Sequence, residues 1–187
     1  MRIIAGQFRG TALASVGKGD KSSHLRPTTD RVRESLFNVL MGGRYGDPIT
    51  KARVLDLFAG TGALGLEALS RGAAEVVFVD DGRKAGALIR ENISLTRAGA
   101  LTRLINWDAT RLLANSGAAF DLIFLDPPYG KGMGEKALAA AVSGGWITSA
   151  ALIVWEENTP KAAPDGFKLV DHRKYGDTHM TFLEMTV

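Results

Sequence analysis

The sequence has no cysteine in its 187 residues, and this absence excludes several kinds of chemistry. Disulfide frameworks, iron–sulfur clusters and thiolate nucleophiles all require cysteine. The three histidines, His24, His172 and His179, are scattered and lack the close spacing of zinc ligands, so we expect no metal site. Any catalysis must therefore depend on carboxylates, hydroxyls, backbone groups and a bound cofactor.

Long apolar runs are also absent. No stretch approaches the ~18 consecutive apolar residues of a membrane-spanning helix. The apolar stretch at the N-terminus is too short for a signal peptide. Hydrophobic residues make up 45% and charged residues 23% of the chain, which are the proportions of a globular domain. We therefore expect a cytoplasmic, monomeric protein with one well-buried core.

The net charge of +3 is small, but its distribution is uneven. Residues 1–33 contain seven basic and two acidic side chains, a local net charge of +5, whereas the remaining 154 residues sum to −2. A basic arm on an acidic-leaning body is typical of a protein that docks a polyanion at one end. A solvated surface loop would explain the same charges.

The first part of the chain, residues 1–44, reads as a small extension. Short strand-like segments at 2–6 and 11–15 predict a hairpin, and a polar stretch rich in glycine and serine follows at 17–23. Thr28, Thr29 and Asp30 then provide N-capping side chains for a helix over 29–41. Val32 and Leu36 begin its apolar stripe, so we expect this helix to dock on the body.

Strands and helices alternate in the second part, residues 45–187. Apolar runs occur at 54–58, 76–79, 104–107, 122–125 and 152–155, with candidate helices at 63–71, 83–97, 109–115 and 134–143. Continuous apolar strands separated by helices predict a Rossmann-like α/β fold with a mostly parallel sheet covered on both faces. The last two runs, 167–172 and 179–186, lie too close together for a crossover helix, so they predict an antiparallel hairpin.

A glycine-rich loop follows the first of these strands. Gly60, Gly62 and Gly65 have the GxGxxG spacing, which lets a backbone turn tightly and approach a ligand at a helix N-terminus. Asp80 follows the next strand, where a carboxylate can accept hydrogen bonds from ribose hydroxyls. The pattern therefore predicts a nucleotide-containing cofactor.

Two features favour S-adenosylmethionine over a dinucleotide. Asp56 lies just before the loop, where its carboxylate can hold an ammonium group but would repel a pyrophosphate. Asp108 and Ala109 follow the third strand, where a carboxylate can accept from an adenine amino group. Asp108 is a weak indication, because many surface helices begin with an aspartate cap.

The fourth strand ends in Asp126-Pro127-Pro128-Tyr129. Two prolines end the strand in a rigid turn without N–H donors, so the Asp126 carboxylate and the Pro127 carbonyl remain as acceptors. Such acceptors suit the two N–H donors of a nucleobase amino group, and the Tyr129 ring offers a face for a displaced base to stack on. This turn therefore predicts direct methyl transfer to an amino nitrogen.

These motifs, in this order, resemble class I S-adenosylmethionine-dependent methyltransferases that act on amino groups. The segments 2–6, 9–10, 26–40 and 175–178 are similar to those of the bacterial RsmD family, over essentially the whole chain. The resemblance implies a seven-stranded sheet with an antiparallel last hairpin and methylation of guanine N2 in small-subunit (16S) ribosomal RNA. Asp80 departs from the glutamate that many class I methyltransferases carry.

The resemblance also implies ribosomal RNA as the partner, either free or within an assembling small subunit. The candidate RNA contacts are the arginines of the basic arm: Arg2, Arg9, Arg26, Arg31 and Arg33. The last three could instead pair with carboxylates near the cofactor.

Three alternatives remain. A DNA adenine-N6 methyltransferase would use the same Asp-Pro-Pro-Tyr turn, although the short chain leaves no room for a target-recognition domain. An NAD-dependent oxidoreductase would use the glycine loop and Asp80, but it would leave that turn unexplained. A non-catalytic RNA-binding module would have no need for both motifs.

Overall fold

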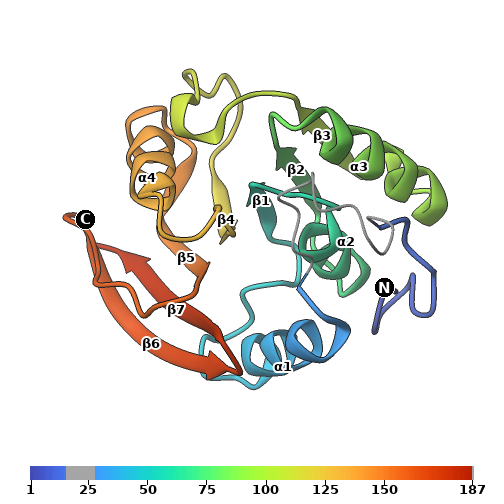
Figure 1. Cartoon of the computed structure of the whole chain (residues 1–187), viewed down its shortest axis with the longest axis horizontal. Helices are drawn as coiled ribbons and strands as arrows, with labels where there is room; N and C mark the ends of the chain where they lie inside the picture. Colours follow the sequence, from blue (N-terminus) through green and yellow to red (C-terminus); the bar gives the residue numbers. More distant parts are fainter. Residues whose placement is uncertain (16–27, 187) are drawn as a thin grey trace.

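A seven-stranded sheet in the order β3-β2-β1-β4-β5-β7-β6 forms the centre of the molecule (Figure 1). The structure is a computed structural model that describes residues 1–15 and 28–186. The strands are β1 (Arg53–Leu57), β2 (Glu75–Val79), β3 (Thr102–Ile105), β4 (Phe120–Leu125), β5 (Ile147–Glu157), β6 (Phe167–Tyr175) and β7 (Thr178–Met185). The helices are α1 (Asp30–Met41), α2 (Ala63–Ser70), α3 (Arg83–Thr96) and α4 (Met133–Ser143), with short 3-10 turns η1 (Gly99–Leu101) and η2 (Ala109–Arg111).

Strand directions agree with the sequence pattern. The pairs β1–β2, β1–β4, β2–β3 and β4–β5 are parallel, whereas β7 runs antiparallel to both β5 and β6. The predicted mostly parallel sheet and its antiparallel C-terminal hairpin are therefore confirmed. Because the strand order reverses between β1 and β4, the loops after these strands diverge and leave a crevice at the carboxyl edge of the sheet.

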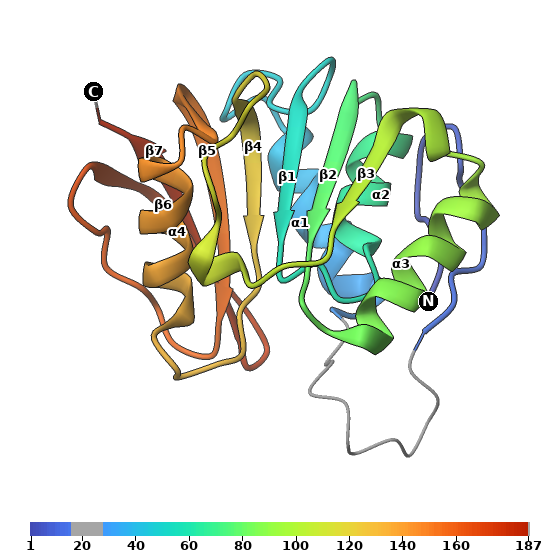
Figure 2. The same ribbon diagram turned by 90° about the horizontal axis from the view of Figure 1, so that it is seen from above.

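Apolar side chains cover both faces of the sheet. Alternate residues of β1 point to opposite sides: Val54 joins one hydrophobic cluster with α1, α2 and α3, and Leu55 joins a second with α4. Figure 2 shows the strands side by side with helices in front of and behind them. Within the described residues, no helix is both long and apolar enough to cross a membrane.

Two sequence-based expectations need correction. The helix expected at 109–115 is only the 3-10 turn η2, because the Asn115 side chain bonds to Gly117 and Ala118 and so competes with helix formation. The N-terminal hairpin forms only in part: its two segments pair antiparallel at Arg2 and Ala12 and through backbone hydrogen bonds such as Ile3 N to Thr11 O, but neither segment is a regular strand.

The helix expected at 29–41 does form, with the Thr29 side chain as its N-cap. The expected polar loop at 17–23 lies outside the described residues.

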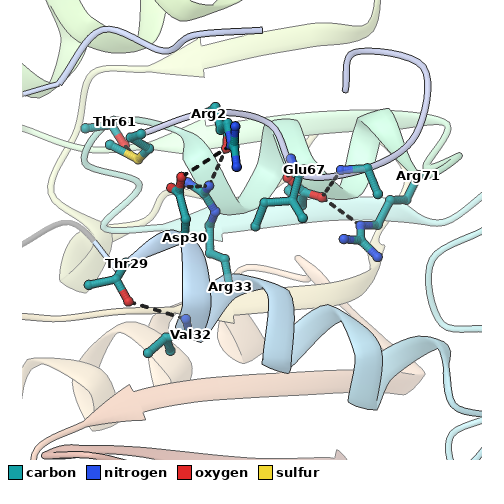
Figure 3. A network of polar contacts seen from close by, with 11 residues as sticks. Arg2, Thr29, Asp30, Val32, Arg33, Thr61, Glu67 and Arg71 are labelled. Carbon is teal, nitrogen blue, oxygen red and sulfur yellow. Dashed lines mark hydrogen bonds and ion pairs between the residues drawn. The ribbon is translucent and has the colours of Figure 1, made fainter. Parts of the chain in front are cut away.

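We define the N-terminal extension as residues 1–15 and 28–41, the second of which contains α1. Its first segment is held by buried polar side chains of the body. The Glu67 carboxylate on α2 accepts from the amides of Ile4 (2.8 Å) and Ala5 (3.1 Å) and from Arg71 Nε (2.7 Å), as Figure 3 shows. On α3, the Asn92 side chain bonds to both backbone groups of Ala14 and donates to the Thr61 carbonyl (2.9 Å). The extension is thereby tied to the helix that follows the glycine loop and to the loop itself.

A close approach of backbones completes this attachment. Gly6 has a φ of +82°, and a Cβ at this position would lie 1.8 Å from the Ser70 carbonyl oxygen. The Ser70 hydroxyl accepts from the Phe8 amide and donates to the Ala5 carbonyl. Only glycine fits here, so the position of the segment on α2 is fixed by sterics as well as by hydrogen bonds.

Candidate active site

A cavity of about 700 Å³ lies where the strand order reverses. Its walls come from the loops after β1, β2 and β4, together with Thr28 and the first residue of α4, Met133. Ligands of open α/β folds bind at this edge of the sheet, outside the carboxyl ends of the strands. The cavity is thus the candidate active site.

The glycine loop and Asp80 meet in this cavity, as the sequence predicts. One oxygen of the Asp80 carboxylate accepts from the Gly60 amide (2.9 Å) and the other from the Gly82 amide (2.8 Å). Each oxygen keeps a lone pair for a ligand. Burial raises the pKa of Asp80 despite these two hydrogen bonds. Phe58, which also lines the cavity, has a φ of 59°, a strained conformation for a side chain of its size.

Asp56 forms the floor of the cavity on the β1 side. The carboxylate is 1% exposed and accepts from the Gly65 amide (2.9 Å) at the start of α2. Burial raises its pKa to about 8, and the nearby Asp80 adds to this effect. A cationic group in the cavity would stabilise the ionised carboxylate, so the site favours a ligand with an ammonium group.

The Asp126-Pro127-Pro128-Tyr129 turn forms the opposite wall. The Asp126 amide donates to the Leu57 carbonyl (3.3 Å), which joins this turn to the end of β1. The pKa of Asp126 is raised well above its usual value, first by burial and then by surrounding carboxylates. Asp56 and Asp126 therefore face one cavity from adjacent strands, and the structure brings the predicted cofactor and catalytic residues together.

Three polar residues beside the turn were not predicted. Glu156 and Glu157 end β5, and they accept from the Tyr129 hydroxyl (2.8 Å) and the Gly130 amide (3.1 Å) respectively. Thr28 donates to the second oxygen of Glu156 (3.0 Å). Two acidic residues directly after the apolar run 152–155 were a usable signal, because they mark the carboxyl end of a buried parallel strand.

Not every predicted cofactor residue lines the cavity. Gly62 is the N-cap of α2, with a φ of 75°, and packs against the Phe78 ring. Asp108 caps η2 by accepting from the Thr110 amide (2.8 Å), and Ala109 is buried in that turn. The adenine contact of Asp108 and Ala109 stays a prediction.

The arginines of the basic arm separate into two groups. Arg2, Arg9 and Arg31 are exposed and line a second cavity of about 320 Å³ beside the N-terminal segment. Arg33 is completely buried; it pairs with Asp30 (2.9 Å) and donates to the Arg2 carbonyl (Figure 3). The expected RNA contact of Arg33 is therefore wrong, since this side chain holds the extension together from inside.

Arg26 lies outside the described residues. Within residues 1–15 and 28–186, no group of three or more histidine, aspartate or glutamate side chains is placed to hold a metal ion.

Comparisons with known proteins agree with this architecture. A family model described as conserved hypothetical protein 95 matches residues 1–184. The ribosomal RNA small subunit methyltransferase D of Escherichia coli K12 is 40% identical over 164 residues, which cover 88% of this chain and 78% of the relative. The protein of the same name from Haemophilus influenzae is 34% identical over 181 residues, covering 94% and 89%.

Solved structures give the same result. The structure of the Escherichia coli protein yhhF aligns with a TM-score of 0.82 at 36% identity, covering 99% of this chain and 97% of the other. A crystal structure of a Haemophilus influenzae protein aligns with a TM-score of 0.76 at 30% identity, covering 98% and 97%. The chain therefore belongs to the conserved hypothetical protein 95 family, the RsmD-type methyltransferases, and has the class I methyltransferase fold.

Proposed function

We propose that this chain methylates the exocyclic N2 amino group of a guanine in small-subunit ribosomal RNA, with S-adenosylmethionine as methyl donor. Relatives named ribosomal RNA small subunit methyltransferase D support the RNA substrate. The observation that carries the proposal is the Asp126-Pro127-Pro128-Tyr129 turn, which shares one cavity with the glycine loop and Asp80.

The cavity residues fit S-adenosylmethionine. Asp80 keeps acceptor capacity for ribose hydroxyls, and the buried Asp56 carboxylate suits the ammonium group of the methionine part. Gly60, beside them, lets the backbone approach the ligand closely. When bound, this cofactor supplies a methyl group attached to a positively charged sulfur.

The Asp-Pro-Pro-Tyr turn would orient the guanine. Asp126 and the Pro127 carbonyl accept the two amino hydrogens, which favours a more pyramidal nitrogen with its lone pair directed toward the methyl carbon. The Tyr129 ring supports the base by stacking. Positioning is then the main catalytic effect, since the nitrogen attacks directly and loses its proton afterwards.

The exposed arginines would bind the RNA backbone. Arg2, Arg9 and Arg31 surround the second cavity next to the N-terminal segment, and guanidinium groups form bidentate hydrogen bonds with phosphate. This surface would fix the RNA while a single base is displaced into the active-site cavity. Free rRNA and an assembling small subunit are both open as substrates.

The direct test uses labelled S-adenosylmethionine with small-subunit rRNA, with small ribosomal subunits and with duplex DNA. We expect label in N2-methylguanosine after the RNA is digested to nucleosides. Label in N6-methyladenine of the DNA, or no transfer to any of the three, would contradict the proposal.

A further inference from the structure

Glu156 joins the N-terminal extension to the Asp-Pro-Pro-Tyr turn. One of its carboxylate oxygens accepts from the Tyr129 hydroxyl (2.8 Å) and the other from the Thr28 hydroxyl (3.0 Å). Thr28 directly precedes Thr29, the N-cap of α1, and lies 128 positions from Glu156 in the sequence. Two distant parts of the chain thus share one carboxylate.

Glu156 is buried within the sheet. Glu156 lies in β5 between β4 and β7, is only 5% exposed, and follows the completely buried Trp155. A carboxylate at such a site needs hydrogen-bond donors on both oxygens, because an unpaired buried charge is costly. The Thr28 and Tyr129 hydroxyls meet this need, because each donates to one of the two carboxylate oxygens.

The hydrogen bond to Glu156 constrains the Tyr129 ring. The hydroxyl oxygen lies on the long axis of the ring, so holding it fixes the direction in which the ring points from its backbone. Rotation about that axis is limited by the preference of the phenolic O–H for the ring plane. The phenol is a protonated donor at neutral pH even at its ordinary pKa of 10.0, and burial and the Glu156 carboxylate raise that pKa further. Tyr129 and Thr28 both line the active-site cavity. The position of this ring in the cavity thus depends on Glu156, together with Thr178, which also hydrogen-bonds to the hydroxyl.

We propose that Glu156 and Thr28 are positioning residues that set the orientation of the Tyr129 ring, so that docking of the N-terminal extension completes the base-binding wall of the cavity. The inference rests on the proposed function, in which Tyr129 stacks on the guanine. It adds that the segment carrying the RNA-binding arginines also prepares the active site.

Kinetics provide the first test. Thr28→Val removes the hydroxyl and keeps the β-branched shape; we expect kcat to fall about ten-fold, because a hydrogen bond to a charged group is lost. The dissociation constant of S-adenosylmethionine should change by less than about two-fold, and Thr28→Ser should restore kcat. The matched control is Thr148→Val, which removes a hydroxyl 3.5 Å from the Asp121 carboxylate at the other end of β4.

A double-mutant cycle separates positioning from stability. In a Tyr129→Phe background, Thr28→Val should lower kcat by less than about two-fold further, because the hydroxyl that Glu156 holds is already gone. A full ten-fold loss in that background, or a weaker affinity for the cofactor in Thr28→Val alone, would overturn the proposal. Glu156→Gln keeps one acceptor oxygen and serves as a second variant should Thr28→Val fail to fold.

Fluorine NMR tests the orientation of the Tyr129 ring without a measurement of methyl transfer. The chain has three tyrosines, so incorporation of 3-fluorotyrosine gives three signals, and Tyr129→Phe identifies that of Tyr129. We expect Thr28→Val and Glu156→Gln to shift or broaden this signal alone, and Thr148→Val to leave it unchanged. An unmoved Tyr129 signal in both site variants would overturn the inference. A shifted signal in a protein whose wild type methylates no RNA would refute the proposed function but not the positioning.

Discussion

The methyltransferase body and the N-terminal extension are built by different kinds of interaction. Parallel main-chain ladders hold β1 to β5 together, and two apolar clusters cover the sheet. Residues 1–15 form one β-bridge and bury Ile3 and Leu13 in the first of these clusters. Their remaining contacts to the body include hydrogen bonds with the side chains of Glu67, Ser70 and Asn92. The body therefore depends mainly on strand ladders, whereas residues 1–15 depend more on individual side-chain hydrogen bonds.

The candidate active site and the candidate RNA-binding surface are also positioned in different ways. The ends of β1, β2 and β4 place the candidate cofactor and catalytic residues, so the cavity follows from the topology of the sheet. The surface with Arg2, Arg9 and Arg31 is positioned by polar side chains that reach across from α2 and α3. Substitutions in the two regions should therefore affect different measurements.

The largest effect is expected at the centre of the body. Asp126→Ala should reduce kcat about 1000-fold, or about 4 kcal/mol of transition-state stabilisation, because the amino group loses its acceptor. Binding of S-adenosylmethionine, measured by calorimetry, should be nearly unchanged. A variant that turns over at the wild-type rate would remove Asp126 from the mechanism.

Substitution of a residue that holds the extension should lower the stability of the protein. Glu67→Ala leaves the amides of Ile4 and Ala5 and the guanidinium of Arg71 without their buried partner, so we expect the free energy of unfolding to fall by about 3 kcal/mol. Urea denaturation measures this change. Glu91→Ala, at an exposed position on α3, is the control, and an equal loss in both variants would show that Glu67 is not the anchor.

The raised pKa of Asp56 predicts that the free energy of unfolding depends on pH. Its pKa is 3.8 ordinarily and about 8 in the folded protein, so between these values the folded state keeps a proton that the unfolded state has lost. This contribution makes the free energy of unfolding fall as pH rises, by at most about 1.4 kcal/mol per pH unit, and the fall ends above about pH 8.

Asp56→Asn removes that term and keeps an acceptor for the Gly65 amide. The variant should become more stable relative to the wild type as pH rises, by on the order of 4 kcal/mol between about pH 5 and about pH 8. Denaturation series at several pH values measure the difference. Parallel stability curves for the two proteins would contradict the buried, protonated Asp56.

The smallest effect contrasts two arginines of one helix. Arg31→Ala should weaken RNA binding several-fold and reduce the slope of log K against log salt concentration by about 1, since one phosphate contact is lost. Arg33→Ala should instead lower the free energy of unfolding, because Arg33 is buried and paired with Asp30. An unchanged salt slope in Arg31→Ala would remove that residue from the RNA surface.

The body was predictable from the sequence because its signals are local. Apolar runs such as 76–79 and 122–125 marked parallel strands, and the glycine loop and the double proline marked the ends of β1 and β4. In a parallel sheet, these ends meet at one edge whatever the details of packing. The mostly parallel sheet and the neighbourhood of Asp56, Asp80 and Asp126 followed from that geometry, whereas the number of seven strands came from the family resemblance.

The extension was less predictable because the polar contacts that place it join residues far apart in the sequence. Thr28 and Glu156 are 128 positions apart, and no periodic pattern relates them. In α1, the completely buried residues are Arg33, Leu36, Phe37 and Leu40, whereas the sequence suggested a stripe beginning at Val32. Helical spacing alone would place Arg33 on this face, but its charge favoured an RNA contact or a carboxylate partner. In the structure its Nη2 bonds to Asp30 and to the Arg2 carbonyl, while its Nε and Nη1 have no hydrogen-bond partner among the described residues.

The central claim is that this chain methylates guanine N2 in small-subunit rRNA through Asp126. The most direct measurement is mass spectrometry of nucleosides from small-subunit rRNA of cells that lack the chain, and of the same cells supplied with the wild type or with Asp126→Ala. We expect N2-methylguanosine to be lost at one position and restored by the wild type alone. Unchanged N2-methylguanosine in the cells without the chain, or full restoration by Asp126→Ala, would contradict the claim.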